Sequence, residues 1–411
     1  MLKNYIKIAF KVLRRRKFFT FISLFAISFT LVVLMVVTAI FDHSFGPLAP
    51  ETRADRTLGV FSFKLRGKLG TKSGSAGYLF LDRYVRTLPD VERVSVFSTS
   101  SPVAAYQTGE KVPLNLRYTD GNYWKILDFS FIEGGPLTDE DDRNANPVVV
   151  INEATRGKLF GGQPAVGKTL EINNQRFRVA GVVRNVSAGR FVPFSDVWAP
   201  IGAQKSDAYK TQIFGGFDAI ILARSSDDFP AIKAEFASRV AQMEVPDPQF
   251  NEVVCRAETY FESVSRQMFG GDDGGRPAFL IGIIMLGMAL FMLLPAVNLV
   301  NINVSRIMER ASEIGVRKAF GASSWTLVGQ FVVENVILTL VGGLIGFLIA
   351  WGVLRVITAN DLIQYADLHM NFRVFIYGMG LALFFGLVSG VYPAWRMSRL
   401  NPVQALKGAS R

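Results

Sequence analysis

One segment of the sequence matches the pattern of a nucleotide-binding loop. Residues Gly162–Thr169 read Gly-Gln-Pro-Ala-Val-Gly-Lys-Thr and satisfy G-x-x-x-x-G-K-[ST] at every position. In a P-loop, a strand precedes the loop and a helix follows it, so that backbone N–H groups and the helix N-terminus bind phosphates. Here a Lys-Leu-Phe-Gly turn comes first, and residues 170–179 alternate around Asn173 and Asn174, which predicts a hairpin. We therefore interpret Gly162–Thr169 as a turn and expect it to bind no cofactor.

The other residue types that support catalysis or metal binding do not form useful patterns. His43 and His369 lie far apart, and neither has a cysteine or a second histidine at metal-ligand spacing. The acidic run 139–142 lacks the spacing of a calcium loop, which favours a solvated turn. The sequence has no Gly-x-Ser-x-Gly nucleophile elbow. We predict no catalytic residue, no metal site and no cofactor in this chain, and hence no enzyme activity of its own.

The residues most suited to recognising a partner form a short charged segment between two long apolar ones. Residues 309–322 read Glu-Arg-Ala-Ser-Glu-Ile-Gly-Val-Arg-Lys-Ala-Phe-Gly-Ala. In a helix, Glu313 and Arg317 lie one turn apart and can pair on the exposed face, and Ile314 can face the bilayer or a partner. Its two glycines permit a close approach or end the helix. The residues alone leave two interpretations open: an amphipathic loop at the membrane interface, or a helix on which a soluble protein docks.

Long apolar segments flank this charged one and predict a membrane protein. Half of the residues are hydrophobic, and the mean hydropathy is +0.27. Segments 18–41, 278–304, 331–354 and 372–395 are long enough to span a bilayer. A helix of about 24 residues reaches about 36 Å, against a hydrocarbon core of about 30 Å. The first segment is too long for the apolar part of a signal peptide, and no small-x-small cleavage site follows it, so we interpret it as a retained anchor.

Lysine and arginine residues predict the orientation of these spans. They are concentrated in residues 1–17, 305–327 and 396–411, which the positive-inside rule places in the cytoplasm. Both termini are thus predicted to be cytoplasmic, and residues 42–277 and 355–371 to lie outside. The net charge of +11 comes from the membrane-flanking segments, because residues 42–277 hold 28 Lys and Arg against 29 Asp and Glu. The charge therefore indicates contact with anionic lipid and excludes the nucleic-acid binding expected of an evenly basic protein.

The predicted extracytoplasmic domain has enough residues for a large core. We expect strands at 57–65, 91–98, 217–222 and 251–256, and helices at 78–88, 229–243 and 257–268, with a Gly/Ser-rich stretch at 70–77. The residues between these two βαβ-like halves, about 100–213, are rich in strand and turn signals. This pattern predicts a split α+β sandwich with an inserted β-rich subdomain. A single cysteine, Cys255, excludes an intramolecular disulfide framework.

Several motifs together resemble a known family. Residues 310–322 match the signature Arg-x-x-Glu-Ile-Gly-[Ile/Val]-Arg-Lys-Ala-x-Gly-Ala at Arg310, Glu313, Ile314, Gly315, Val316, Arg317, Lys318, Ala319, Gly321 and Ala322. Glu334 matches an acidic position after that signature, and residues 389–394 and 401–406 are similar to a closing motif. Segments of the outer domain also follow the pattern, at 121–124, 147–151, 159–161, 166–168 and 177–182. Over nearly its whole length the chain resembles the FtsX-like permeases, the membrane subunits of MacB-type ABC transporters.

The resemblance implies a four-span permease that works as a dimer and binds two copies of an ABC ATPase subunit. Residues 306–322 would form the coupling helix that docks on the ATPase, and ATP and Mg would bind in that partner subunit. About 17 residues precede the first span, so we expect the ATPase in trans, with a second permease that is identical or homologous. In this family substrate usually does not pass through the spans. Instead, the ATP-driven closure of the dimer is relayed to the outer domain. This relay is called mechanotransmission.

Two further features of the sequence leave alternatives open. Small residues recur every fourth position on the third and fourth spans, at Gly342, Gly346, Ala350, Ala382, Gly386 and Gly390. Packing within one chain and contact between two permeases explain these ridges equally well. The Gly/Asp-rich segment 270–277 cannot continue a helix. It therefore departs from the continuous stalk that the family often has, and we hypothesise a hinge there.

The resemblance is compatible with two functions at the bacterial cytoplasmic (inner) membrane. The first is efflux, as export or extraction of a peptide, antibiotic or lipoprotein from the outer side. The alternative is a transmembrane regulator with the same motor that controls a cell-wall hydrolase or senses a ligand. The size of the inserted subdomain favours, by analogy, a further periplasmic partner such as an adaptor with an outer-membrane channel. Neighbouring genes would separate the two functions.

Overall fold

The structure of the protein is a computed structural model. It describes residues 6–7, 11, 13–15, 17–68, 70–107, 110–245, 247–269, 276–309, 316 and 324–398. The chain divides into two compact units. The first, here called the helical unit, comprises residues 1–42, 281–362 and 368–411, and the second, called the α/β unit, comprises residues 43–280 and 363–367.

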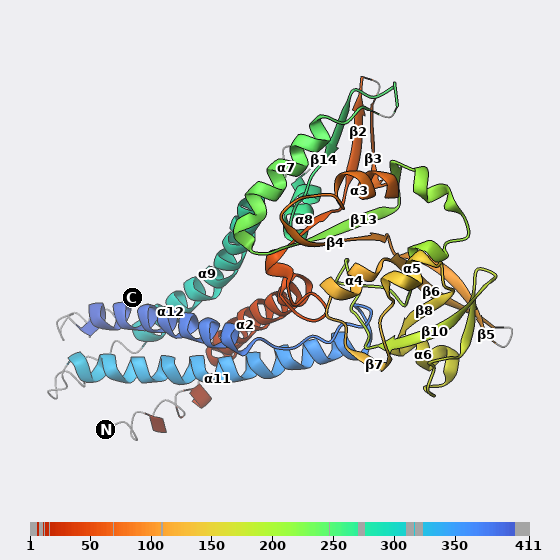
Figure 1. Ribbon diagram of the computed structural model, residues 1–411. Coiled ribbons are helices and arrows are strands. Elements are labelled where there is room, and N and C mark those ends of the chain that lie inside the picture. The colour runs from red at the N-terminus through yellow and green to blue at the C-terminus, as the bar shows by residue number, and fades with distance from the viewer. Residues whose placement is uncertain are drawn as a thin grey trace. The chain divides into compact units, whose positions relative to one another are not determined.

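The helical unit is built from long apolar helices (Figure 1). They are α2 (Lys17–Phe45), α9 (Pro277–Glu309), α11 (Ser324–Ala359) and α12 (Phe372–Ser398), of which residues 43–45 and 277–280 belong to the α/β unit. Each predicted span lies within one of these helices. Among the described residues, Lys17–Phe45 and Val332–Ala359 are long and apolar enough to cross a membrane, and shorter apolar stretches occur at Pro277–Phe291 and Phe372–Val388.

One part of the α/β unit is formed by the two ends of its sequence. Its elements are β1 (Thr57–Val60), β2 (Phe63–Gly67), β3 (Gly70–Ala76), α3 (Tyr78–Tyr84), β4 (Val91–Ser98), β12 (Phe214–Gly215), β13 (Phe217–Ala223), α7 (Phe229–Ala241), β14 (Glu252–Cys255) and α8 (Tyr260–Phe269). Strand β13 pairs antiparallel with both β1 and β4. Strands β1 and β4 therefore run parallel on either side of β13 and are joined through α3, which is a split βαβ unit.

The other part of the α/β unit comes from the middle of its sequence. Its elements are β5 (Ser101–Gln107), β6 (Glu110–Thr119), α4 (Gly121–Ile126), β7 (Phe131–Gly134), α5 (Asp139–Arg143), β8 (Val148–Asn152), α6 (Glu153–Phe160), β9 (Thr169–Ile172), β10 (Gln175–Val183) and β11 (Val197–Pro200). The strand order is β11-β8-β10-β9-β5-β6-β4-β13-β3-β2-β14. Strands β5 to β11 thus gather on one side, and β2, β3 and β14 on the other (Figure 1).

Local sequence explains the central strand and the tightest hairpin. All seven residues of β13, Phe-Asp-Ala-Ile-Ile-Leu-Ala, are buried, as expected of a strand covered on both faces. Strands β9 and β10 are joined by Asn173 and Asn174, whose φ angles are 49° and 60°. Asparagine tolerates this left-handed conformation, which a two-residue hairpin turn requires. Short 3-10 helices at Ala54–Arg56, Ile201–Ala203, Asp207–Thr211 and Ser226–Asp228 complete the connections.

The structure corrects the prediction of a single strand at residues 57–65. Residues 57–65 are not one strand, because β1 ends at Val60 and β2 begins at Phe63. The break lets β1 pair with β13 while β2 pairs with β3 and β14. The Gly/Ser-rich stretch 70–77 is mostly strand β3, since pairing with β2 supplies the order that its own residues do not favour.

Candidate functional site

The charged segment that the sequence singles out lies between α9, which ends at Glu309, and α11, which begins at Ser324. Within it, Val316 is helical and exposed. The predicted coupling residues lie outside the described part of the chain: Arg310, Glu313, Ile314, Gly315, Arg317, Lys318, Gly321 and Ala322. The same holds for most of the hinge hypothesised at 270–277. Both assignments stay predictions.

The small residues on α11 face α2 within the helical unit. A Cβ atom added at Gly346 would lie 3.0 Å from the backbone oxygen of Ser28, and one at Gly342 would lie 3.0 Å from the side chain of Ile27. Ala350 is fully buried. Because these positions lack bulky side chains, the two helix backbones approach closely here.

The small residues on α12 show a similar close contact at one position. A Cβ atom added at Gly386 would lie 2.9 Å from the hydroxyl oxygen of Thr339 on α11. Ala382 is partly buried, and the surroundings of Gly390 lie outside the described residues. The contacts of Gly342, Gly346 and Gly386 are made within one chain, and contact between two permeases at these ridges stays a prediction.

Replacing Gly346 by leucine should destabilise the helical unit by about 1–3 kcal/mol, as overpacking usually does. The nearest atom is the backbone oxygen of Ser28, which cannot move aside as the end of a flexible side chain can. Thermal unfolding of the full chain in detergent measures the loss. Gly352→Leu is the control on the same helix, because a Cβ atom there meets no atom within 4 Å. Equal losses in the two variants would contradict the close contact.

Buried polar residues form a row on the first half of α11. Glu334 is 1% exposed, and its Oε1 accepts a hydrogen bond of 3.0 Å from Nε2 of Gln330. Asn335 and Thr339 are buried beside it. An ionisable side chain inside an apolar helix is costly and marks a functional position by default. The acidic position to which the resemblance points is therefore enclosed by the helical unit.

Arg190 holds the incoming segment, residues 43–56, by which the chain passes from α2 into the α/β unit. Its Nη1 donates to Oε2 of Glu51 at 2.9 Å and to the carbonyl of Leu48 at 3.2 Å, and its Nη2 donates to the carbonyl of Gly46 at 2.8 Å. The Arg190 side chain is 3% exposed and that of Glu51 is 16% exposed. Burial raises the pKa of the Glu51 carboxyl, and the Arg190 guanidinium opposes that rise.

A second buried ion pair holds the outgoing helix α8. Nε and Nη2 of Arg266 donate to the two carboxylate oxygens of Glu258 at 3.1 and 2.5 Å, a paired geometry in which both side chains are about 5% exposed. The backbone of Glu258 exchanges hydrogen bonds of 2.8 and 2.9 Å with Gly59 in β1. Lys233 of α7 pairs with Glu262 of α8 at 2.7 Å. The outgoing helix is thus fixed to the core of the α/β unit.

Five aromatic rings join the incoming segment to the outgoing helix. Phe191 and Tyr260 stack with centroids 6.0 Å apart, and Phe61 meets both rings edge-on at 6.1 and 5.9 Å. Phe45, the last residue of α2, contacts Tyr260 at 5.8 Å and Phe261 at 5.2 Å. Each such pair contributes about 0.5–1.5 kcal/mol beyond its buried area. The incoming segment and helix α8 are therefore in contact through these rings, so a displacement of one acts on the other.

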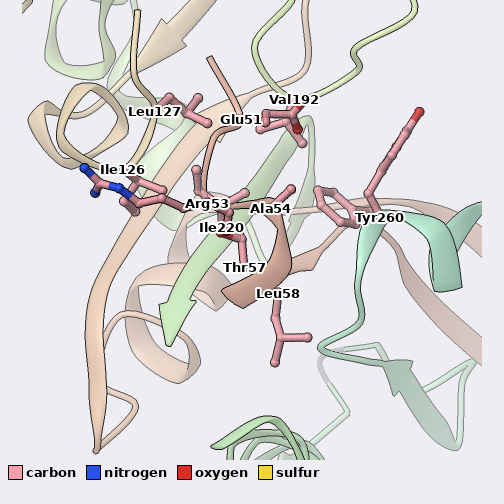
Figure 2. Close-up of a pocket in the computed structure, with 11 residues that line it drawn as sticks. Glu51, Arg53, Ala54, Thr57, Leu58, Ile126, Leu127, Val192, Ile220 and Tyr260 are labelled. Atoms are coloured by element: carbon pink, nitrogen blue, oxygen red, sulfur yellow. The ribbon is translucent and has the colours of Figure 1, made fainter. Parts of the chain in front are cut away.

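A small cavity lies beside this aromatic cluster (Figure 2). Its volume is about 40 Å³, and its lining is mostly apolar: Glu51, Arg53, Ala54, Thr57, Leu58, Phe61, Ile126, Leu127, Val192, Ile220 and Tyr260. The side chains labelled in Figure 2 come from the incoming segment, β1, the end of α4, the loop before β11, β13 and the start of α8. A single water needs about 10–15 Å³. The cavity is therefore far too small for a peptide or an antibiotic.

The P-loop-like segment Gly162–Thr169 forms the turn that leads into β9. The Gly167 amide donates to the carbonyl of Val179 at 2.9 Å, and Nζ of Lys168 lies 5.4 Å from the centre of the Phe160 ring. A strand follows the loop, because β9 begins at Thr169 and pairs antiparallel with β10. The segment therefore lacks the helix N-terminus that a phosphate site of this type uses.

The acidic run 139–142 and the single cysteine both have roles in the fold. Residues 139–142 form the first turn of α5, where Thr138 and Asp141 make a reciprocal capping box, and acidic groups there interact favourably with the helix dipole. Cys255 is buried in β14. Among the residues that the structure describes, no three His, Cys, Asp or Glu side chains are grouped so that they could hold a metal ion.

Sequence reasoning does not single out the residues of the two buried ion pairs. Arg190 and Glu51 are 139 residues apart, and Glu258 and Arg266 are separated by 8, which is not a helical pairing distance. Other charged residues lie close by in the sequence, such as Arg53 after Glu51 and Arg256 before Glu258, so no local signal marks these pairs.

Comparison with known proteins gives matches over most of the chain. The MacB-like periplasmic core domain matches residues 20–239, and the FtsX-like permease C-terminal domain matches residues 285–402. The uncharacterized ABC transporter permease YknZ of Bacillus subtilis is 24% identical over 337 residues, which cover 82% of this chain and 81% of YknZ. The macrolide export ATP-binding/permease protein MacB of Azoarcus is 26% identical over 328 residues, 79% of this chain and 47% of that protein. The solved periplasmic region of MacB from Actinobacillus actinomycetemcomitans is 19% identical and covers 45% of this chain and 84% of its own, with a TM-score of 0.36.

Proposed function

The chain belongs to the MacB-type family of FtsX-like ABC transporter permeases, and from this membership we propose that it relays ATP hydrolysis in a separate subunit to its extracytoplasmic domain. It is a permease subunit of an ABC transporter, and its periplasmic-core-type domain lies outside the cytoplasm. Family membership implies an ABC ATPase partner and a permease dimer. We propose two ATPase copies and a second permease that is identical or homologous.

The observation that carries this proposal is the charged segment between α9 and α11. Ten of its residues match the family signature, and its own Lys and Arg residues predict a cytoplasmic location under the positive-inside rule. A partner that binds there acts on two apolar helices at once, because the segment continues directly into both. The two buried ion pairs support the other end of the relay, since they hold the incoming segment and α8 firmly in the α/β unit.

The proposed topology has four spans with both termini in the cytoplasm. Helices α2, α9, α11 and α12 contain 29, 33, 36 and 27 residues. At about 1.5 Å per residue, each is longer than the hydrocarbon core of about 30 Å. We propose that the chain lies in the bacterial cytoplasmic membrane, and that ATP and Mg bind in the partner subunit. The turn geometry of Gly162–Thr169 supports the view that this chain binds no nucleotide there.

The proposed activity is export or extraction of a peptide, antibiotic or lipoprotein from the outer side of the membrane. The name of the Azoarcus relative describes a macrolide exporter, which is one compound class of this kind. A periplasmic adaptor and an outer-membrane channel are further proposed partners. The alternative is a transmembrane regulator that controls a cell-wall hydrolase or senses a ligand. A gene for a hydrolase or a sensor kinase beside this one would support that alternative.

Charge reversal in the charged segment tests the proposal. We expect an ATPase to co-purify with the wild-type chain from its native membrane, and the Glu313→Lys/Arg317→Glu variant to lose most of it, because the docking charges change sign. The measurement is the amount of co-purified ATPase and its hydrolysis rate. The matched control is Glu171→Lys/Arg176→Glu, which reverses an exposed pair 3.9 Å apart on the β9–β10 hairpin and should keep the ATPase. Wild-type chain that brings no ATPase would overturn the proposed function.

A further inference from the structure

A short piece of the connection between α11 and α12 belongs to the α/β unit. Helix α11 ends at Ala359 and α12 begins at Phe372, and both lie in the helical unit. Residues 363–367, between them, are grouped with the α/β unit. The chain therefore reaches the α/β unit at a third place, besides the incoming segment after α2 and the outgoing helix α8.

Hydrogen bonds attach this piece to the rest of the α/β unit. The hydroxyl of Tyr365 donates to Oδ1 of Asp196 at 2.8 Å, and the amide of Ala188 donates to the carbonyl of Gln364 at 2.9 Å. Ala366 is 4% exposed, so the piece is packed as well as hydrogen-bonded. Tyr365 has a φ of 58°, a left-handed conformation that costs a bulky residue free energy. Such a conformation persists only where surrounding contacts hold it.

The acceptor, Asp196, is a hub of the β-rich part. It is 2% exposed and immediately precedes β11. Its Oδ2 accepts from the amide and the side chain of Asn115 in β6 at 2.8 and 2.9 Å, and its Oδ1 accepts from Nδ2 of Asn152 in β8 at 3.1 Å as well as from Tyr365. A pull on the Tyr365 hydroxyl therefore acts on three neighbouring strands at once.

The chemistry of the pair suits a permanent attachment. Burial and the neighbouring Asp196 carboxylate raise the pKa of Tyr365 to about 12. The phenol therefore stays protonated and remains a donor at any physiological pH. Asp196 satisfies its lone pairs with four donors, so loss of the tyrosine leaves it anchored to the sheet.

We propose that Tyr365 and Asp196 form a latch through which movement of α11 and α12 reaches strands β6, β8 and β11 directly. This inference rests on the proposed function, because it assigns a second route to the relay that the charged segment starts. The incoming segment and α8 deliver movement of α2 and α9. The latch delivers movement of the other two helices to the opposite part of the same sheet.

Tyr365→Phe tests the latch, because it removes one hydroxyl and keeps the ring. The full chain, purified with its ATPase, carries spin labels at Lys158→Cys on α6 and Ala234→Cys on α7, which are exposed positions in the two parts of the α/β unit. Cys255 is buried and burial raises the pKa of its thiol, so it stays unlabelled. The distance between the labels is measured without nucleotide and with ATP trapped by vanadate. Tyr106→Phe, at an exposed tyrosine on β5, is the matched control.

We expect the nucleotide-dependent distance change to fall at least twofold in Tyr365→Phe and to be unchanged in Tyr106→Phe. The ATPase rate should stay within twofold of wild type, because the docking segment is untouched. If the distance change in Tyr365→Phe were as large as in the wild type, the latch would be overturned and the proposed function would stand. A wild-type complex without ATPase or without any distance change would overturn both.

Discussion

Replacing Arg190 by methionine should lower the free energy of unfolding of the α/β unit by about 3–5 kcal/mol, the usual cost of removing one partner of a buried ion pair. Methionine keeps the apolar volume but supplies no donor. Glu51 then stays buried without its ion-pair partner, and the carbonyls of Gly46 and Leu48 lose a hydrogen bond each. Denaturant unfolding of the full chain in detergent, with hydrogen exchange followed in the incoming segment, measures this loss.

The dependence of this loss on pH identifies its cause. Burial already raises the pKa of Glu51, and removal of the Arg190 charge raises it further. In the variant, the folded protein therefore binds a proton more readily than the unfolded chain does. Its stability is retained at pH below the ordinary pKa of glutamate and falls as the pH rises through the raised value. The loss relative to wild type should be largest at pH 8 and clearly smaller at pH 5.

Two further variants separate the ion pair from general effects. Arg190→Met/Glu51→Gln should recover a large part of the loss at pH 8, because no charge is left unpaired. Arg176→Met is the surface control, since this side chain is 85% exposed and its pair with Glu171 spans 3.9 Å. It should change stability by less than about 1 kcal/mol. An Arg190→Met variant as stable as this control would contradict the assigned role of the buried pair.

Features set by neighbouring residues could be predicted from the sequence. Strand β4 occupies 91–98 as expected, and β13 occupies Phe217–Ala223, because runs of β-branched and apolar residues between turn signals leave little choice. The hairpin at Asn173 and Asn174 follows from turn chemistry alone. The long helices likewise follow from the length of their apolar runs.

Features set by distant residues could not be predicted in this way. Tyr365 and Asp196 are 169 residues apart, and a tyrosine in a polar connection carries no sign of its acceptor. The break after Val60 depends on which strands β1 and β2 pair with, and those partners lie far along the chain. The proposed docking role of the charged segment rests on a family signature, because its residue types alone are equally compatible with an interfacial loop.

Asp218→Asn should raise the free energy of unfolding of the α/β unit at pH 7.5 by about 2–3 kcal/mol. Asp218 lies in β13 and is 0% exposed, and this burial is the main cause of the shift in its pKa. Burial raises the pKa of Asp218 to about 6, although the Arg117 guanidinium and a smaller contribution from Ser75 act in the opposite direction. A rise from 3.8 to about 6 corresponds to about 3 kcal/mol, since one pKa unit is about 1.4 kcal/mol.

The sign of this effect follows from proton binding. Between pH 4 and 6 the folded protein binds a proton at Asp218 that the unfolded chain has already released, so wild-type stability falls as the pH rises through this window. Asparagine keeps the shape of the neutral acid and cannot ionise. The variant and wild type should therefore be equally stable near pH 4 and diverge above pH 6, as measured by unfolding at both pH values. The exposed Asp227→Asn is the control and should show no such divergence.

The opposite result would be equally informative about Arg117. This guanidinium is 1% exposed, donates to the carbonyls of Phe191 and Phe194 at 2.9 and 3.2 Å, and lies 5.0 Å from the Phe97 ring. These contacts satisfy part of its charge without a carboxylate. If Asp218→Asn lost stability at pH 7.5, the attraction between Asp218 and Arg117 would exceed the cost of burying the carboxylate. The centre of the sheet would then be held by a third buried charge pair, in addition to those at the incoming segment and at α8.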